Sequence, residues 1–293
     1  MPDGSISSFP RVDGHRIYVR SFGRGRSRPP LLCVHGGPGS THDYLLPHTD
    51  LGRRGHRVVF YDALGCGRSD LPETLGLYTH AHDLKVLDAI VDSLGARRIH
   101  LLGSSYGGML VLHYAASHSD RLASVVSVGG LCDVPFAARE MRRLVRELPA
   151  RTRRVLDRYG RRGEFTHPAY EAAMMEFYRR HVCRLRPWPE GVASALAKMS
   201  RPVYQTMNGP NEFTIVGNIR DIDFTGELRR ISVPTLVIHG KYDEVTPAVG
   251  RRIHAAVPGA RLRIFPRSSH LSFWEQRPEY MRLVGDFLAG ASG

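Results

Sequence analysis

The fold of this chain is decided by residues 99–113, Ile99-His-Leu-Leu-Gly103-Ser104-Ser105-Tyr106-Gly107-Gly108-Met-Leu-Val-Leu-His113. Residues 98–102 form an apolar run of strand length, and the apolar residues of 109–116 fit a helix buried on most sides. Between them lies Gly-x-Ser-x-Gly, centred on Ser105. In this motif the serine sits on a strained turn that exposes its hydroxyl, and the glycines let strand and helix pack closely. The spacing therefore predicts Ser105, rather than Ser104, as a nucleophile.

The composition is that of an ordinary globular chain. Its 293 residues are 42% hydrophobic and 24% charged, which allows one large core and an insertion. No run approaches about 18 apolar residues and the first residues lack a signal pattern, so we expect no membrane association and a cytoplasmic location. No Cys-x-x-Cys spacing occurs, so we expect reduced thiols and neither disulfides nor a metal site at Cys33, Cys66, Cys132 and Cys183.

The net charge of +13 raises the possibility of a basic, non-enzymatic binding module. Lysine occurs only at positions 85, 198 and 241, so 38 of the 41 basic residues are arginine, a bias typical of genomic base composition. Residues 134–220 hold 17 basic and 8 acidic residues, spread over helix faces rather than interleaved with aromatic residues in a groove. We interpret this charge as a solvated surface and expect no nucleic-acid partner.

Strand and helix patterns alternate along most of the chain and predict eight strands. An antiparallel hairpin at residues 5–11 and 15–22, around an Asp-Gly turn, opens the series. The remaining strands are predicted at 31–34, 57–61, 98–102, 122–128, 233–238 and 261–265. Between them, residues 134–220 have a helical pattern, with helices expected at 136–148, 168–183 and 190–199. We therefore predict a mostly parallel eight-stranded α/β sheet as the core, residues 1–133 and 221–293, with an all-helical cap, residues 134–220, inserted after the sixth strand.

A serine nucleophile needs a base to take its proton and an acid to orient that base. In the α/β-hydrolase fold these residues occur in the chain order Ser, acid, His. His270 follows the last predicted strand, and either Asp243 or Glu244 can supply the acid after the penultimate one. We prefer Asp243, which follows the strand-end Gly240 by three residues, as the acid of this fold commonly does. The predicted triad is Ser105, Asp243 and His270.

The oxyanion formed on attack needs two N–H donors. One is predicted to be Tyr106, directly after the nucleophile, and the other comes from the loop His35-Gly-Gly-Pro-Gly39, at Gly37 or its neighbour Gly36. The loop at residues 62–70, which follows the next strand, is expected to support the site, with a pairing of Asp62 and Arg68.

Four motifs together resemble the proline iminopeptidase family of serine aminopeptidases, and most closely its tricorn-interacting aminopeptidase branch. They are the two glycine-rich loops above, Met207-Asn-Gly-Pro-Asn-Glu-Phe-Thr214 and Gly240-Lys-Tyr-Asp-Glu-Val-Thr-Pro247. The resemblance covers essentially the whole chain and implies hydrolysis of an N-terminal residue, often proline, from short peptides. It implies the same triad and the N–H groups of Gly37 and Tyr106 as oxyanion donors.

The family resemblance also implies that two carboxylates hold the free α-amine of the substrate, at the positions of Glu212 and Glu244. The chain departs from the family at Asp62-Ala-Leu-Gly65, where many members have Asp-Gln-Arg-Gly. No metal or organic cofactor is expected. An alternative keeps the triad and changes the substrate, giving an amidase, esterase or acyl-transfer enzyme that acts on an amino-acid-like small molecule.

Overall fold

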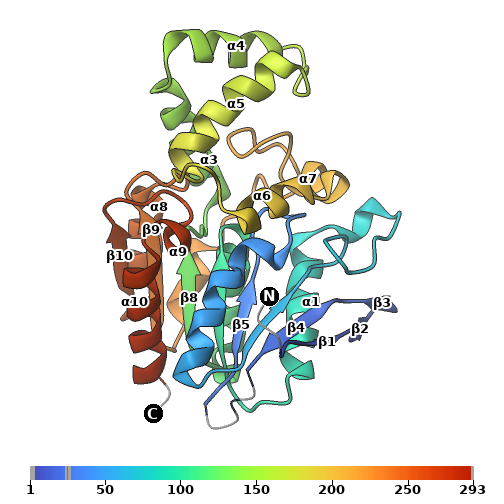
Figure 1. Ribbon diagram of the computed structural model, residues 1–293, viewed down its shortest axis with the longest axis vertical. Coiled ribbons are helices and arrows are strands. Elements are labelled where there is room, and N and C mark those ends of the chain that lie inside the picture. Colours follow the sequence, from blue (N-terminus) through green and yellow to red (C-terminus); the bar gives the residue numbers. More distant parts are fainter. Residues whose placement is uncertain (1–3, 24, 26–27, 292–293) are drawn as a thin grey trace.

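An eight-stranded sheet forms the centre of the computed structural model, which describes residues 4–23, 25 and 28–291. The strand order is β1-β4-β6-β5-β7-β8-β9-β10, and the six strands from β6 to β10 in this order pair in parallel (Figure 1). The prediction of a mostly parallel α/β-hydrolase sheet is confirmed. The strands are β1 (Ile6–Ser8), β4 (Val19–Phe22), β5 (Leu31–Val34), β6 (Val58–Tyr61), β7 (Ile99–Ser104), β8 (Leu122–Val128), β9 (Thr235–Gly240) and β10 (Arg261–Phe265).

The opening hairpin is antiparallel as predicted, but it is not continuous. Strand β1 pairs with β4 in the large sheet, whereas β2 (Arg11–Val12) and β3 (His15–Arg16) form a separate two-stranded ribbon. Pro10 lies at the break, and it has no N–H to donate to a ladder. Its carbonyl accepts instead from the N–H of Ile17, where the chain returns from the ribbon.

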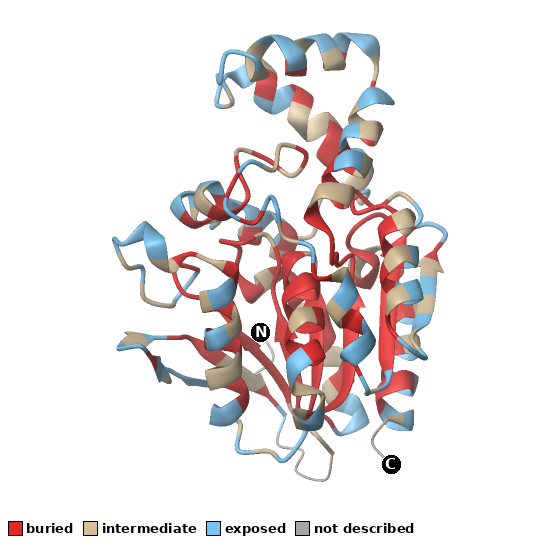
Figure 2. Cartoon of the chain, turned by 180° about the vertical axis from the view of Figure 1, so that it is seen from behind, coloured by how far each residue is buried: buried red, intermediate tan, exposed pale blue. Residues whose placement is uncertain are grey.

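The central strands are buried on both faces, so their side chains alternate between two apolar layers (Figure 2). In β5, Leu32 and Val34 pack in one layer with helices α1 (His80–Ser93), α2 (Tyr106–His118) and α8 (Pro247–Ala256). Leu31 and Cys33 point the other way and pack with η1 (His42–Arg54), α9 (Ser272–Glu275) and α10 (Arg277–Gly290). The sheet is thus covered on both faces, and only its edges and strand ends are open to a ligand.

Five helices lie between β8, the sixth strand of the large sheet along the chain, and β9. They are α3 (Val134–Arg146), α4 (Ala150–Gly160), α5 (Pro168–His181), α6 (Glu190–Ala197) and α7 (Arg201–Met207). They gather at one end of the sheet, with α4 outermost (Figure 1). The sequence predicted three of them and missed α4 and α7, because Gly160 and the adjacent prolines interrupt their short apolar patterns.

The segment that carries these helices leaves and rejoins the sheet at a single point. Asp133 forms a β-bridge with Asp223, and the N–H of Val134 donates to the carbonyl of Ile222. Arg252 on α8 contacts Oδ2 of Asp133 at 2.7 Å and Oδ2 of Asp223 at 4.0 Å. None of the helices in the described part of the chain is long and apolar enough to cross a membrane.

Candidate active site

Ser105 occupies a strained turn between β7 and α2. Its φ of 59° and ψ of −125° lie in a region that few residues other than glycine adopt. The two glycines of the motif permit this turn, since a Cβ at Gly103 would overlap the carbonyl of Gly107, and one at Gly107 would overlap the carbonyls of Val34 and His35. The turn places Ser105, half-buried, on the wall of a cavity below helix α6.

The structure brings the other two predicted triad residues to the same edge of the sheet. Asp243 follows β9 and His270 follows β10. Oδ1 of Asp243 lies 2.6 Å from Nδ1 of His270 and also accepts from the N–H of Val245. His270 and Ser105 line the same cavity, but no hydrogen bond joins them among the described residues, and Nε2 of His270 is buried without a partner.

Burial and charge act in opposite directions on this pair. Burial opposes the charged form of Asp243, but the positive charge and hydrogen bond of His270, together with the nearby ring of His239, lower the pKa of Asp243 to about 2. Burial would likewise lower the pKa of His270, but Asp243 first, and then Glu244 and Glu212, raise it to about 9. The arrangement therefore stabilises an imidazolium, the form that a general base takes after it has accepted a proton.

Gly36 and Gly37, the two candidate oxyanion donors in the loop at residues 35–39, differ in their hydrogen bonds. The N–H of Gly36 donates to the hydroxyl of Tyr44 at 2.5 Å, so it is already used. Within the described chain, no hydrogen bond uses the N–H of Gly37 or of Tyr106. Gly37 and Ser105 line the same cavity. This geometry favours Gly37 over Gly36, and it gives Tyr44, which the sequence did not single out, a place in the site.

The side chain of Tyr106 is held by polar groups beneath the turn. Its hydroxyl donates to Oδ2 of Asp83 at 2.7 Å and lies 3.2 Å from Nδ1 of His80. Nε2 of His80 lies 2.9 Å from Nδ1 of His113, whose ring stacks on Phe224. These contacts join α1 to α2 directly behind the residue that follows the nucleophile.

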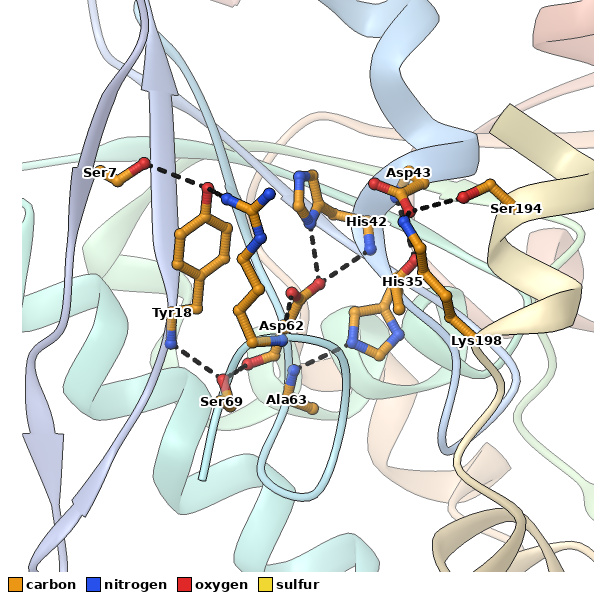
Figure 3. A network of polar contacts seen from close by, with 12 residues as sticks. Ser7, Tyr18, His35, His42, Asp43, Asp62, Ala63, Ser69, Ser194 and Lys198 are labelled. Carbon is orange, nitrogen blue, oxygen red and sulfur yellow. Dashed lines mark hydrogen bonds and ion pairs between the residues drawn. The ribbon is translucent and has the colours of Figure 1, made fainter. Parts of the chain in front are cut away.

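Asp62 connects the start of η1 to the loop after β6 (Figure 3). Its Oδ1 accepts from the backbone N–H of His42 and lies 2.8 Å from Nδ1 of that ring, and its Oδ2 accepts from the backbone N–H of Arg68. Asp62 and Arg68 do contact, but through the backbone N–H of Arg68, and no ion pair joins their side chains in the described part of the chain. Gly67, at φ +51°, turns the backbone onto the carboxylate, and the guanidinium donates to the hydroxyl of Tyr18 instead.

Asp43, which follows His42 in η1, links this segment to helix α6 (Figure 3). Its Oδ2 accepts from Nζ of Lys198 at 2.7 Å and from the hydroxyl of Ser194 at 3.2 Å. Helix α6 has only eight residues and begins after Pro189, which offers no side-chain cap. Its position over the cavity therefore depends on such contacts with η1.

Both predicted amine-binding residues, Glu212 and Glu244, line the cavity that contains Ser105 and His270. Burial raises the pKa of each carboxyl, and for Glu244 the neighbouring Glu212 raises it further. Two buried carboxyl groups that share a site favour a cation between them, because the cation removes their mutual repulsion. The hydroxyl of Tyr178, on α5, accepts from the N–H of Glu212 at 3.4 Å.

One carbonyl of the inserted helices contacts both the loop after β9, which carries Asp243 and Glu244, and the loop after β10, which carries His270. The carbonyl oxygen of His181, the last residue of α5, accepts from the N–H of Glu244 at 3.2 Å and from the N–H of His270 at 3.1 Å. Nδ1 of the same residue lies 2.9 Å from the carbonyl of Tyr242. No sequence signal pointed to His181, since its role comes from a backbone atom.

Two cavities meet at Ser105. The first, about 90 Å³, has Glu212, Glu244 and His270 on one side and an apolar wall on the other, made by Trp188, Val192, Ala195, Leu196 and Met199. The second, about 30 Å³, shares Gly37, Ser105 and Glu212 with the first and is otherwise mainly apolar, lined by Met109, Leu131, Met141, Ile215, Ile219 and Val245. Ser105 can thus be reached from two sides by two parts of one ligand.

A larger cleft lies apart from this site. A surface cleft of about 970 Å³ is larger than either cavity, but it lies at the opposite edge of the sheet, between the residues that precede β5, β6 and β7. Of the described residues that line it, four are arginines and none is a carboxylate; the arginines are Arg28, Arg57, Arg97 and Arg98. Within residues 4–23, 25 and 28–291, no group of three or more histidines, cysteines and carboxylates has the geometry of a metal site.

Comparison with known proteins agrees with the motifs and the fold. The profile of the alpha/beta hydrolase fold family matches residues 29–276. The proline iminopeptidase of Saccharolobus solfataricus is 42% identical over 282 residues, which cover 96% of this chain and 91% of that protein. The crystal structure of VinJ superposes with a TM-score of 0.95 at 34% identity, covering 98% of this chain and 99% of the other. That of proline iminopeptidase from Mycobacterium smegmatis superposes with a TM-score of 0.90 at 34% identity, covering 99% of each chain.

The similarity covers nearly the whole length of this chain and of each relative. It confirms the resemblance drawn from the four motifs. The chain belongs to the proline iminopeptidase family of the alpha/beta hydrolases.

Proposed function

We propose that the protein is a serine exopeptidase of the prolyl aminopeptidase type, which removes the N-terminal residue from short peptides. One observation carries this proposal: Ser105, His270, Glu212 and Glu244 line a single cavity. A nucleophile with its base defines a hydrolase, and two buried carboxyl groups beside them define a preference for a substrate with a positive charge next to the bond that breaks.

In the proposed reaction, Oγ of Ser105 attacks the carbonyl carbon of the first residue while Nε2 of His270 takes the hydroxyl proton. Asp243 keeps the ring oriented and stabilises its charge. The N–H groups of Gly37 and Tyr106 donate to the oxyanion. His270 then protonates the leaving amine, and a water molecule releases the first residue from the acyl-enzyme. Each step uses a group of this chain or water, so the proposed reaction calls for no cofactor.

Glu212 and Glu244 are proposed to bind the free α-amine of the substrate. A peptide with a blocked N-terminus loses this interaction and leaves both carboxyl groups buried without a cation, which disfavours its binding. The apolar wall from α6 then faces the part of the ligand that carries no charge. We further propose residues 134–220 as the cap and residues 1–133 and 221–293 as the core. The free thiols of all four cysteines support a cytoplasmic location.

The test is hydrolysis of a panel of aminoacyl-arylamides, with N-acetylated controls, by the wild type and by Ser105→Ala. Prolyl and alanyl arylamides should be cleaved and acetylated ones should not. Ser105→Ala should lower kcat by at least about 10⁴-fold. Ser104→Ala removes the adjacent hydroxyl, which is fully buried at the end of β7, and should retain most activity. Unchanged hydrolysis by Ser105→Ala would exclude this mechanism. Hydrolysis of amino-acid esters or amides with inert peptides would favour the small-molecule alternative.

A further inference from the structure

The reacting nitrogen of His270 faces a carboxylate in the unliganded site. Oε1 of Glu244 lies 3.8 Å from Nε2 of His270, and the two side chains are 3% and 5% exposed. Nε2 makes no hydrogen bond within the described chain, and neither does Oε2 of Glu244. Asp243 contacts the other ring nitrogen at 2.6 Å. The imidazole is therefore placed between two carboxylates, one at each nitrogen.

The backbone fixes this arrangement. The carbonyl of His181 accepts from the N–H of Glu244 and from the N–H of His270, so the two loops share one anchor on α5. Gly129 packs against the ring of His270, since a Cβ at this position would lie 2.6 Å from Nδ1 and Cε1. Neither the ring nor the loop of Glu244 can move away without breaking these contacts.

A histidine between two carboxylates is stabilised as its imidazolium form on both sides, so it already carries the proton that a general base would have to accept. Attack by Ser105 requires the opposite, a neutral Nε2 that can take a proton. The other titratable groups near His270 do not make its neutral form more favourable. Glu212 adds a further carboxyl, His239 lies 3.6 Å from Oδ2 of Asp243, and Tyr178 and Tyr204 are buried phenols beside Glu212.

We propose that the substrate's own ammonium group activates the base. Without substrate, Glu244 holds His270 as an imidazolium and the enzyme is inactive. When the ammonium binds between Glu212 and Glu244, it neutralises the charge of Glu244, and Nε2 of His270 releases its proton to solvent. This inference rests on the proposed function, and it gives Glu244 a role in catalysis besides amine binding.

The charge balance of this step is simple. One cation, the substrate ammonium, enters the buried cluster, and one proton leaves it, while no covalent bond of the peptide changes. Burial followed by the effect of Glu212 raises the pKa of Glu244, and Asp243, Glu244 and Glu212 raise that of His270 to about 9 against the effect of burial, so Glu244 and Nε2 of His270, 3.8 Å apart, compete for one proton in the free protein. Both directions agree with a cluster that holds an extra proton until a cation replaces it.

The direct test is the titration of the His270 ring, followed by NMR on histidine-labelled Ser105→Ala and assigned by comparison with Ser105→Ala/His270→Gln. The probe is the amide of the dipeptide Pro-Ala. In the free protein the ring should titrate near pH 9, and with the probe bound the pKa should fall by at least about one unit. Adding Glu244→Gln should lower it in the absence of the probe. A probe that binds without shifting the titration would overturn the inference.

A kinetic test separates base activation from amine binding. An aryl ester of an N-acetylated amino acid has no ammonium, so when it binds, His270 stays protonated and inactive as a base. Glu244→Gln should raise kcat for this ester at about pH 7 by about tenfold or more, and should lower kcat/KM for a prolyl arylamide. Glu212→Gln is the matched control, because it removes one carboxyl of the pair and leaves Glu244 beside His270. It should raise KM for the arylamide, and it should raise kcat for the ester by less than Glu244→Gln does, because Glu244 is the carboxyl that lies 3.8 Å from Nε2 of His270.

The outcomes distinguish the two proposals. If free-amine peptides are neither bound nor cleaved, the proposed function fails and this inference fails with it. If they are cleaved, while Glu244→Gln changes neither the titration of His270 nor ester turnover, only the inference fails.

Discussion

Two buried aspartates of this protein show how the partner, and not burial alone, sets the charge of a side chain. Asp243 and Asp83 are both enclosed, at 1% and 7% exposure. Asp243 faces the ring of His270, and its pKa falls to about 2. Asp83 faces the neutral hydroxyl of Tyr106, and burial raises its pKa to about 7 in spite of that hydrogen bond. Asp243 therefore stays charged, while Asp83 titrates near neutrality beneath the turn that carries Ser105.

Asp83 should make the stability of the fold depend on pH. Its pKa in the folded state lies above the ordinary value of 3.8, so folding favours its protonated form. The resulting stabilisation is complete below about pH 4 and is lost as the pH rises through about 7. Asparagine cannot ionise and can still accept from Tyr106. The free energy of unfolding of the wild type, relative to Asp83→Asn, should fall by about 2–4 kcal/mol between about pH 4 and pH 8 in urea titrations.

Asp88 provides the matched control for this experiment. It accepts from the hydroxyl of Tyr114 at 2.8 Å, so it repeats the contact between α1 and α2, but its side chain is 42% exposed. Asp88→Asn should show no comparable pH-dependent difference from the wild type. Parallel pH curves for the wild type and Asp83→Asn would contradict the prediction.

At the scale of the elements, the sequence predicted the strands of the sheet and the place of the candidate triad residues relative to them. Both follow from local patterns, because Ser105, Asp243 and His270 lie in the turns that follow β7, β9 and β10. The short helices α4 and α7 and the 3-10 segment η1 were missed, since prolines and polar residues interrupt their periodicity. Tyr44 and His181 could not be predicted at all. Their contacts join segments far apart in the chain, and for His181 the contact uses a backbone atom that every residue has.

Helix α6 should be the most easily loosened wall of the cavity. Asp43 binds it through Lys198 and Ser194. Asp43→Asn removes the ion pair, an interaction that is partly exposed and worth about 0.5–1 kcal/mol. We expect amide hydrogens of residues 190–197 to exchange several-fold faster, and KM for prolyl arylamides to rise about two- to fivefold with kcat nearly unchanged. Hydrogen exchange by mass spectrometry and steady-state kinetics give the two measurements.

Asp50→Asn controls for damage to η1 itself. Asp50 lies in the same segment and pairs with Nε of Arg277 at 2.8 Å, so its loss loosens the contact with α10 and not with α6. Exchange in residues 190–197 should then stay at the wild-type rate. Equal effects of the two variants would show that η1, and not the contact of Asp43 with α6, controls the cavity wall.

Over the whole molecule, charge is separated between the surface and the site. The net charge is +13, and the arginine-lined cleft lies at the edge of the sheet opposite Ser105. The cavity at Ser105, in contrast, contains two buried carboxyl groups. Under the proposed function, a substrate approaches through a positive field and is then held by the two carboxyl groups, so the field acts on the rate of encounter and the carboxyl groups act on binding.

This separation predicts opposite effects of salt on a cationic and on an anionic dipeptide substrate. For Pro-Arg-amide, a cation, kcat/KM should rise about two- to fivefold between about 20 mM and 300 mM NaCl, because salt screens the repulsion. For Pro-Glu, which carries a net negative charge, it should fall by a similar factor. Hydrolysis followed by chromatography measures both. The same trend for the two peptides would show that the surface charge does not act on the substrate.

The pairing of β8 with β9 has a consequence for the order in which the molecule is made. One neighbour of β8 in the sheet is β7, and the other is β9 (residues 235–240), which leaves the ribosome only after the chain of all five inserted helices. During synthesis, β8 therefore presents an open, apolar edge until β9 arrives, the situation in which a strand pairs with foreign chains. The proposed nucleophile, Ser105, is present throughout this interval, while Asp243 and His270 are still to be made. A nascent chain is thus prone to aggregation before it can hydrolyse anything.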